Sequence, residues 1–273
     1  MYGLGAANYL GDLGGADRIG TNLLRDLEMK ATRPAFIGGL RYKNSPYFAV
    51  KGTLVIGWIY GSDNLTKQFD RNYRNLTFRS PIIELSGQFE GYFTKEKPSH
   101  LYRIRNARGI RKSNIQAYGF VGVGLFFFNP QGLQKDGSWV SLQPLGTEGQ
   151  LIEPGKKKYS RFSVSFPMGL GMKYKLSRRF SVGMEVGMRK TLTDYLDDVS
   201  TNYYDKSAIL AKQGAAAAYL SDPSASGSSG GNHPEKTAMG EQRGDPTDKD
   251  SYMFLTFNGN YKFHRRKKTR SKF

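Results

Sequence analysis

The longest regular pattern in the chain is a strict alternation of apolar and polar or small residues over 162–176. Large apolar side chains occupy every even position from Phe162, while serine, proline, glycine and lysine occupy the odd positions. A β-strand turns successive side chains to opposite faces, so the alternation predicts one long strand with a fully apolar face. The alternation restarts at Phe180 after three polar residues, 177–179, which predicts a hairpin of two antiparallel strands.

The same alternation recurs along the whole chain, and it predicts eight strands. We place them at residues 2–10, 31–42, 47–60, 77–93, 115–128, 159–176, 180–192 and 251–263. Most connections alternate in length: 43–46 and 177–179 are tight turns, whereas the long ones are 11–30, 61–76, 129–158 and 193–250. Outer-membrane β-barrels show this asymmetry, with short periplasmic turns and long outer loops, and an even number of strands then puts both termini on the periplasmic side.

The two faces of the predicted strands differ in a way that decides which one is buried. One face is bulky and apolar throughout, whereas the other is rich in Gly and Ser and carries few charges. Small residues and paired charges suit the interior of a narrow barrel, while Phe, Leu, Met and Val suit lipid. We therefore expect an all-β fold, an eight-stranded antiparallel transmembrane β-barrel of the outer-membrane type with long outer loops and a filled lumen. A soluble β-sandwich is the alternative.

Charged residues of both signs lie on the polar face, and we expect them inside the barrel. These lumen charges are Arg33, Arg41, Lys51, Glu84, Glu90, Lys173, Glu185 and Arg189. The aromatic residues Trp58, Tyr60, Tyr174 and Tyr261 fall near strand ends on the apolar face, where aromatic side chains mark the boundary between membrane and water. A barrel of eight strands leaves no aqueous channel, so a porin is not expected.

Length and composition fit one barrel domain at residues 1–263, followed by a basic tail at 264–273. The chain has 273 residues, a mean hydropathy of −0.55 and no apolar run of about 18 residues that would form a transmembrane helix. No basic and apolar leader precedes the first strand, so we expect no signal peptide, and an exported protein would be represented here by its mature or trimmed chain. Within the outer loop 193–250, residues 207–220 predict a helix and the Ser- and Gly-rich stretch after them predicts a flexible segment.

Positive charge is concentrated in the segments that should lie on the periplasmic side. The chain carries 41 Lys and Arg and 23 Asp and Glu, a net charge of +18. Segments 43–46, 94–114, 177–179 and 264–273 together hold sixteen basic residues and one acid, Glu96, which accounts for +15 of that total. We call this surface the basic periplasmic face. The residues expected to bind a partner there are Lys95, Lys97, Arg103, Arg105, Arg108, Arg111, Lys112, Arg178, Arg179, Arg265, Arg266, Lys267 and Lys268.

A charge field of one sign favours an acidic partner and raises the rate of encounter with it. Segment 94–114 strengthens this expectation because it is much longer than a turn requires and carries apolar residues among its charges. The alternative is that the basic residues only keep this end hydrated or contact anionic lipid. A basic tail such as HRRKKTRSKF also suggests nucleic acid in general, but a partner of that class is not expected on a membrane barrel.

The sequence offers little for catalysis or for binding a metal or cofactor. Its three histidines are His100, His233 and His264, and a hydrolase would need a base and a nucleophile held together at a rigid rim. The acids at 193–200 lack the Gly-centred spacing of a calcium loop, so capping and turn roles are favoured. Gly122 and Gly124 form no phosphate-binding fingerprint. The chain has no cysteine, which excludes disulfides and thiolate sites. We expect no catalytic, metal or cofactor residues and no enzymatic activity.

Four motifs occur in an order that resembles one family. They are ANYLGDL at 7–13, RPAFIGGLRY at 33–42, VGVGLFFFNP at 121–130 and TDYLDDVS at 193–200. Together they are similar to the PorG family of outer-membrane β-barrels, and the resemblance covers most of the chain. The outer loop at 201–250 is not characteristic of the family. A signal sequence, which belongs to the family pattern, is not seen before the first strand.

The resemblance implies a function that the residues alone do not name. PorG-like proteins are eight-stranded barrels of the type IX protein secretion system, the export route shared with gliding motility, and they associate with a periplasmic ring of the lipoprotein PorK and the protein PorN. The chain would then anchor that ring from the outer membrane, surrounded by outer-membrane lipid. A stand-alone structural or adhesive barrel of the OmpX or OmpA kind, acting through its outer loops, is the alternative.

Overall fold

A computed structural model gives the structure of the chain. The part of the chain that it describes comprises residues 1–11, 13, 29–65, 69–94, 114–177, 179–224 and 234–263.

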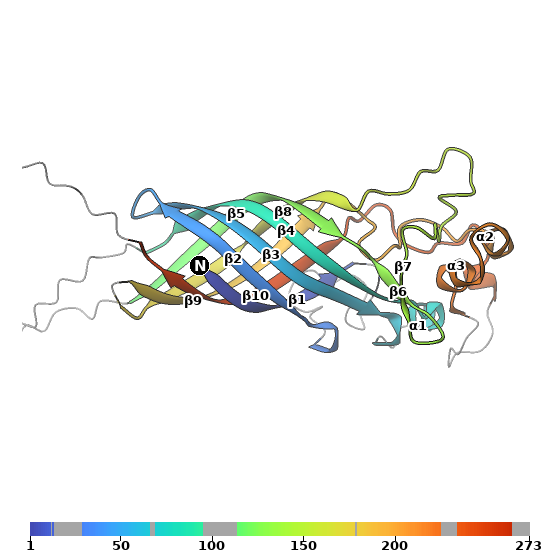
Figure 1. The fold of residues 1–273 in the computed structure, drawn as a ribbon, viewed down its shortest axis with the longest axis horizontal. Helices are drawn as coiled ribbons and strands as arrows, with labels where there is room; N and C mark the ends of the chain where they lie inside the picture. The colour runs from blue at the N-terminus through green and yellow to red at the C-terminus, as the bar shows by residue number, and fades with distance from the viewer. Residues whose placement is uncertain are drawn as a thin grey trace, which may run out of the picture.

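Eight long antiparallel strands form a closed barrel (Figure 1). They are β1 (Tyr2–Leu10), β2 (Arg33–Lys43), β3 (Phe48–Ser62), β4 (Thr77–Tyr92), β5 (Ile115–Phe128), β8 (Phe162–Lys175), β9 (Phe180–Thr191) and β10 (Ser251–Tyr261). The order around the barrel is β3-β2-β1-β10-β9-β8-β5-β4, and pairing between β3 and β4 closes it. The predicted fold class is confirmed, and every expected strand is present with its ends within three residues of the predicted ones.

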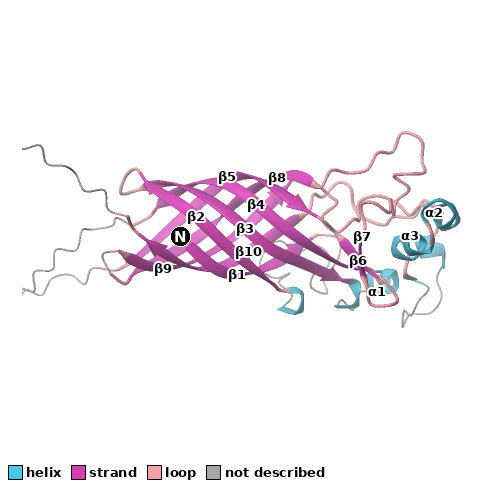
Figure 2. Cartoon of the chain, viewed as in Figure 1, coloured by secondary structure: helices cyan, strands magenta, loops and turns pink. Residues whose placement is uncertain are grey.

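The remaining elements of the described residues are short and lie in the long connections (Figure 2). Strands β6 (Gln131–Leu133) and β7 (Trp139–Ser141) extend the edge of β4 beyond the barrel. Helices α1 (Phe69–Arg74), α2 (Lys206–Gln213) and α3 (Ala215–Ser221) accompany three turns of 3₁₀-helix, Met29–Ala31, Asp63–Leu65 and Pro234–Thr237. Among the described residues, no helix is both long enough and apolar enough to cross a membrane.

The helix predicted over 207–220 is divided in two. Asp205 caps the start of α2 by accepting a hydrogen bond from the Ser207 backbone N–H. Gly214 separates α2 from α3, and its φ of +89° lies in the region that glycine adopts most readily. The two short helices then pack together through Ile209, Ala217 and Ala218.

The outer surface of the barrel is apolar and its interior is polar, as the alternation predicts. Leu125 on β5 and Leu170 on β8 are 65% and 59% exposed, while the inward-facing Lys51 on β3 and Glu185 on β9 are 0% and 4% exposed. Large apolar side chains on the outside cannot be buried within the chain, so this surface requires lipid around it. This distribution favours the membrane barrel over the soluble alternative.

Glycine on the inner face lets side chains from neighbouring strands cross the lumen. A Cβ atom built on Gly122 would lie 2.3 Å from the Gly87 carbonyl oxygen and 2.8 Å from Gln88 Cγ. One built on Gly124 would lie 2.8 Å from Ser165 Oγ and 2.9 Å from Ser86 Cβ. Both approaches are closer than van der Waals contact, so the two glycines of VGVGL serve packing and not phosphate binding.

Charge on the lipid-facing surface should destabilise the barrel according to its depth. We expect Leu170→Arg, at the middle of β8, to lower the free energy of unfolding in lipid by about 2–4 kcal/mol. Leu40→Arg, near the end of β2, should cost at most about 1 kcal/mol because its side chain reaches the interface. Reversible urea unfolding in lipid vesicles measures both values, and equal costs at the two positions would contradict the assigned membrane span.

Candidate functional site

The two ends of the barrel are built differently, which separates two candidate sites. At the turn end, the segments 44–47 and 176–179 connect their strands tightly, and at the loop end the long connections and α1–α3 gather (Figure 1). The Phe93 amide donates to the Ala117 carbonyl, and the Lys262 amide donates to the Arg179 carbonyl at 2.8 Å. Strands β4 and β10 therefore end, and β5 begins, at the turn end.

The residues of the predicted basic periplasmic face are placed only in part. Arg179 is exposed on the turn between β8 and β9, and Lys43, at the end of β2, has its Nζ 4.6 Å from the centre of the Tyr92 ring. Both lie at the turn end, where the expected face should be. The other expected contact residues lie outside the described residues: Lys95, Lys97, Arg103, Arg105, Arg108, Arg111, Lys112, Arg178, Arg265, Arg266, Lys267 and Lys268.

The lumen nearer the turn end contains a network of buried ion pairs. Arg41 Nη2 lies 2.8 Å from Glu90 Oε1 and 2.9 Å from Glu185 Oε1. Lys51 Nζ lies 2.8 Å from Glu185 Oε2, and both the Lys51 and Glu90 side chains are fully buried. Lys173 adds a fifth member, with its Nζ 3.7 Å from Glu90 Oε2. Side chains from β2, β3, β4, β8 and β9 thus meet across the interior and fill it.

Two further predicted lumen charges form a separate pair, and one lies elsewhere. Arg189 Nε is 3.6 Å from Glu84 Oε2, which also accepts a hydrogen bond of 2.6 Å from the Tyr252 hydroxyl. Arg33 does not join either group. Its guanidinium carbon lies 4.1 Å from the centre of the Tyr60 ring at the loop end, so its expected place inside the lumen is corrected. Arg33 still pairs with Ala7 of β1, but the last register pair between β2 and β3 is Ala35 with Gly57, so Arg33 lies beyond the part of β2 that pairs with β3.

The lumen nearer the loop end is apolar, which the sequence analysis missed. Inward-facing rings and aliphatic side chains pack there into one cluster with residues of the loop 193–250: Tyr9, Val55, Ile59, Phe78, Ile82, Phe126, Phe128, Leu196, Val199, Tyr252 and Phe254. Phe126, for example, lies 5.5 Å from the rings of both Phe128 and Tyr252. Because apolar residues occupy both faces of these strand ends, the period-two pattern weakens there and gives no inward signal.

A polar cap formed by the loops covers the loop end. The fully buried Arg243 guanidinium lies 3.0 Å from Glu148 Oε1 and also donates to the Asp198 carbonyl oxygen. Glu148 accepts from the backbone amides of Ser200 and Thr201 at 2.9 and 3.2 Å. No local motif could have revealed this group, because Glu148 and Arg243 are 95 residues apart.

The acids of TDYLDDVS stabilise the cap from within. Asp194 accepts from the Ser200 hydroxyl at 2.6 Å, and Asp197 accepts from the Val199 backbone amide at 3.0 Å. Asp197 also accepts from the Tyr9 hydroxyl of β1 at 2.7 Å, which ties the loop to the barrel. These are the turn and capping roles that the spacing favours over calcium binding.

Burial in the cap alters the acidity of Asp198. Loss of water raises the pKa of its carboxyl from the usual 3.8 to about 6, although Arg243 and hydrogen bonds from Thr147 and Tyr159 act in the opposite direction. Burial and the nearby Asp198 carboxylate also raise the pKa of the Tyr159 phenol well above 10.0, so that Tyr159 remains a hydrogen-bond donor. The cap therefore contains one carboxyl group that titrates near neutral pH.

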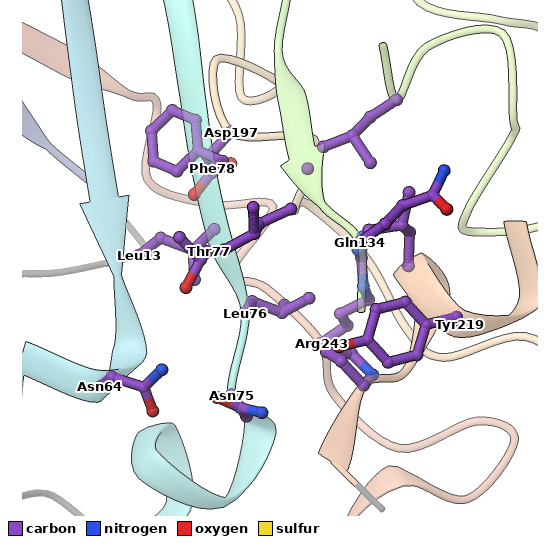
Figure 3. A pocket seen from close by; sticks show the side chains of 15 residues that line it. Leu13, Asn64, Asn75, Leu76, Thr77, Phe78, Gln134, Asp197, Tyr219 and Arg243 are labelled. Carbon is purple, nitrogen blue, oxygen red and sulfur yellow. The ribbon is translucent and has the colours of Figure 1, made fainter. Parts of the chain in front are cut away.

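A cavity of about 180 Å³ lies beneath this cap (Figure 3). In Figure 3, Asn64 lies on one side of it and Gln134 and Tyr219 on the opposite side, with Leu76 between them. Arg243 lines the cavity, and its buried Nε has no hydrogen-bond partner among the described residues. The volume is below the ~300–1,000 Å³ typical of sites for small-molecule ligands, so the cavity fits ordered water better than a substrate.

The described residues contain no cluster of three or more His, Cys, Asp or Glu side chains that could hold a metal ion. His100, His233 and His264 lie outside the part of the chain that the structure describes. The geometry therefore supplies two features to interpret: a turn end with buried ion pairs in the adjacent lumen, and a capped loop end above a filled lumen.

Fold and surface together define the chain as a β-barrel of the outer-membrane class. No protein-family model matches the chain, and no curated protein matches it. A search of solved structures finds similarity to the crystal structure of the outer membrane enzyme PagL, with 10% sequence identity over 96% of this chain and 100% of that chain and a TM-score of 0.33.

This comparison corrects one expectation drawn from the sequence. We expected no enzymatic activity, and that expectation is contradicted because the matched barrel is an enzyme. The low identity and TM-score limit the similarity to the fold, so PagL assigns no activity to this chain. Nothing in the match concerns the PorG resemblance either.

Breaking the lumen ion pairs should destabilise the barrel. Glu185→Gln leaves Arg41 and Lys51 buried with one carboxylate fewer, and we expect it to lower the free energy of unfolding by about 3 kcal/mol. Glu153→Gln removes only an exposed partner of Lys156 and should change stability by less than about 1 kcal/mol. Urea unfolding in vesicles compares the two variants, and an equal effect would argue against a stabilising role of the lumen network.

The cap should loosen as the pH rises through about 6. A carboxyl whose pKa is raised by folding binds its proton more tightly in the folded state, so its stabilising effect is complete below 3.8 and is lost as the pH rises through about 6. We expect protease resistance of the loops to fall over this range in the wild type. In Asp198→Asn, which cannot ionise, that part of the pH dependence should disappear, and an unchanged profile would contradict the assignment.

Proposed function

We propose that the chain is an outer-membrane component of the type IX secretion system that anchors a periplasmic ring of PorK and PorN. The observation that carries the proposal is the distribution of charge along the chain: four segments, each of which joins or follows a strand end at the turn end, hold sixteen basic residues and one acid. The motif order that resembles the PorG family supplies the identity of the partner. In this proposal the turn end faces the periplasm, and both termini lie on that side.

The barrel is suited to hold a large assembly in place. Its apolar exterior fixes it in lipid, and its lumen is filled by ion pairs such as that between Lys51 and Glu185. A filled lumen offers no route for an exported protein, so the barrel would act as an attachment point beside the translocation channel. A ring that is acidic on the facing surface would be attracted and oriented by the basic periplasmic face.

Segment 94–114 is the best candidate for the principal contact. It contains Leu101, Tyr102, Ile104 and Ile110 among its basic residues. Interfaces between proteins combine an apolar centre with a polar rim, so this composition suits a protein partner better than a purely electrostatic contact with lipid.

A second candidate function is a stand-alone structural or adhesive barrel that acts through its loop end. The polar cap is the observation that favours it, because Arg243, Glu148 and Asp197 hold long loops in one arrangement above the barrel. A rigid outer surface of this kind could bind an external partner.

Charge reversal distinguishes the two functions. We expect the fourfold variant Arg103→Glu, Arg105→Glu, Arg108→Glu and Arg111→Glu to abolish co-purification with the PorK and PorN ring and to block secretion. A matched fourfold variant reverses exposed lysines of the loop end, Lys157, Lys158, Lys212 and Lys249. It should leave both properties unchanged. Heat-modifiable migration in gels checks that both variants still form the barrel.

Each outcome has a clear meaning. Unchanged co-purification in the arginine variant would count against the basic periplasmic face as the contact. Loss of function in the lysine variant alone would support action through the loop end.

A further inference from the structure

Two arginines and two aromatic rings form a continuous row on the outside of the barrel at its loop end. The Arg33 guanidinium lies 4.1 Å from the centre of the Tyr60 ring. Tyr60 is the direct cross-strand partner of Arg79, and the Arg79 guanidinium lies 4.4 Å from the Trp139 ring. The row thus crosses β2, β3, β4 and β7, and we call it the Arg–Tyr–Arg–Trp row. The sequence analysis had assigned Arg33 to the lumen and left Arg79 unassigned.

The row faces outward. Phe78 and Ser80, on either side of Arg79, are buried at 1% and 0%, while Arg79 itself is exposed. Ile59, next to Tyr60, is also fully buried, so Tyr60 points away from the lumen. Stacking on Tyr60 places the Arg33 guanidinium on the same outer side.

The row lies directly above the lipid-facing surface. On β2, Phe36 lies closer to the turn end than Arg33, and on β3, Trp58 lies closer to the turn end than Tyr60. The two rings contact each other edge to face, with their centres 6.5 Å apart. Both are exposed on the outer surface. An outward tyrosine and tryptophan at this level mark the boundary between the acyl chains and the lipid headgroups, where the guanidinium groups then lie.

The two guanidinium groups are held in place by neutral partners. Arg33 Nη1 donates to the Lys30 and Thr32 carbonyl oxygens at 3.1 and 2.9 Å, and Arg79 Nε donates to Gln131 Oε1 at 2.9 Å. Within the described residues, neither arginine forms an ion pair with a carboxylate. Several N–H groups of each arginine therefore remain for an anionic acceptor, and stacking on aromatic rings limits the freedom of both side chains.

We propose that the Arg–Tyr–Arg–Trp row binds the phosphate group of a lipid in the leaflet on the loop side, with the acyl chains lying along Phe36 and Trp58. Guanidinium groups recognise phosphate through paired, charge-assisted hydrogen bonds. Two fixed cations on either side of Tyr60 match the double negative charge of a phosphate monoester better than the single charge of a phosphodiester. The apolar surface below and the cationic row above match the two parts of such a lipid.

This inference is independent of the proposed secretion role, because it concerns the opposite end of the barrel. In outer-membrane barrels the long loops face outward, so the lipid would belong to the outer leaflet. A lipid held there would fix the height and rotation of the barrel in the membrane.

Native mass spectrometry of the purified full chain in detergent tests the site, with diphosphoryl lipid A as the probe. We expect the wild type to retain one lipid and the double variant Arg33→Gln, Arg79→Gln to bind about tenfold more weakly or worse, since each lost arginine removes a headgroup contact. The charge-matched control is Arg161→Gln with Lys190→Gln. These residues also lie at the loop end, where Arg161 lies 5.8 Å from the centre of the Phe127 ring, which itself packs 5.2 Å from the Phe162 ring. The control should bind as the wild type does.

Three results would overturn the proposal. They are equal binding by the double variant and the wild type, an equal loss in the control variant, and equal retention of dephosphorylated lipid A or of phosphatidylglycerol, a phosphodiester. Because all four substituted side chains point away from the lumen, heat-modifiable migration should persist in every variant and shows that any loss is local.

Discussion

The need to satisfy every backbone hydrogen bond within the membrane is the constraint on which the rest of this structure depends. A chain surrounded by acyl groups finds no water to pair with its N–H and C=O groups, and a sheet meets this requirement only when it closes. Pairing of β3 with β4 achieves the closure here. Closure with eight strands leaves a narrow lumen, and the contents of that lumen follow from its width.

The lumen is filled in two different ways along its length. Toward the turn end, Arg41, Lys51, Glu90 and Glu185 neutralise one another, so buried charges are tolerated because each has partners. Toward the loop end, aromatic rings fill the same cross-section and continue into the loop residues Leu196 and Val199. The polar cap formed by Arg243 and Glu148 then separates this apolar part from water.

The two ends of the barrel consequently have different capacities for interaction. The loop end is tied together by buried hydrogen bonds, and its outer rim places Arg33 and Arg79 at the membrane boundary. The turn end contributes short connections, and the segments that leave β4 and β10 there in the chain order, 94–114 and 264–273, carry most of the net charge. Partner binding in the periplasm and lipid binding at the outer rim are therefore proposals about separate surfaces that can be tested one at a time.

The sequence by itself determined the strands, because a side chain's face depends only on its position within a strand. The alternation at 162–176 therefore gave both the strand and its lipid-facing side. The concentration of basic residues in four connecting or terminal segments is equally a property of the sequence alone. Only the tertiary structure decided which distant residues meet. It paired Lys51 with Glu185 and Glu148 with Arg243, and it moved Arg33 out of the expected lumen onto Tyr60. The physical reason is that barrel closure, loop packing and side-chain contacts at the rim join residues tens to hundreds of positions apart, and no local pattern records them.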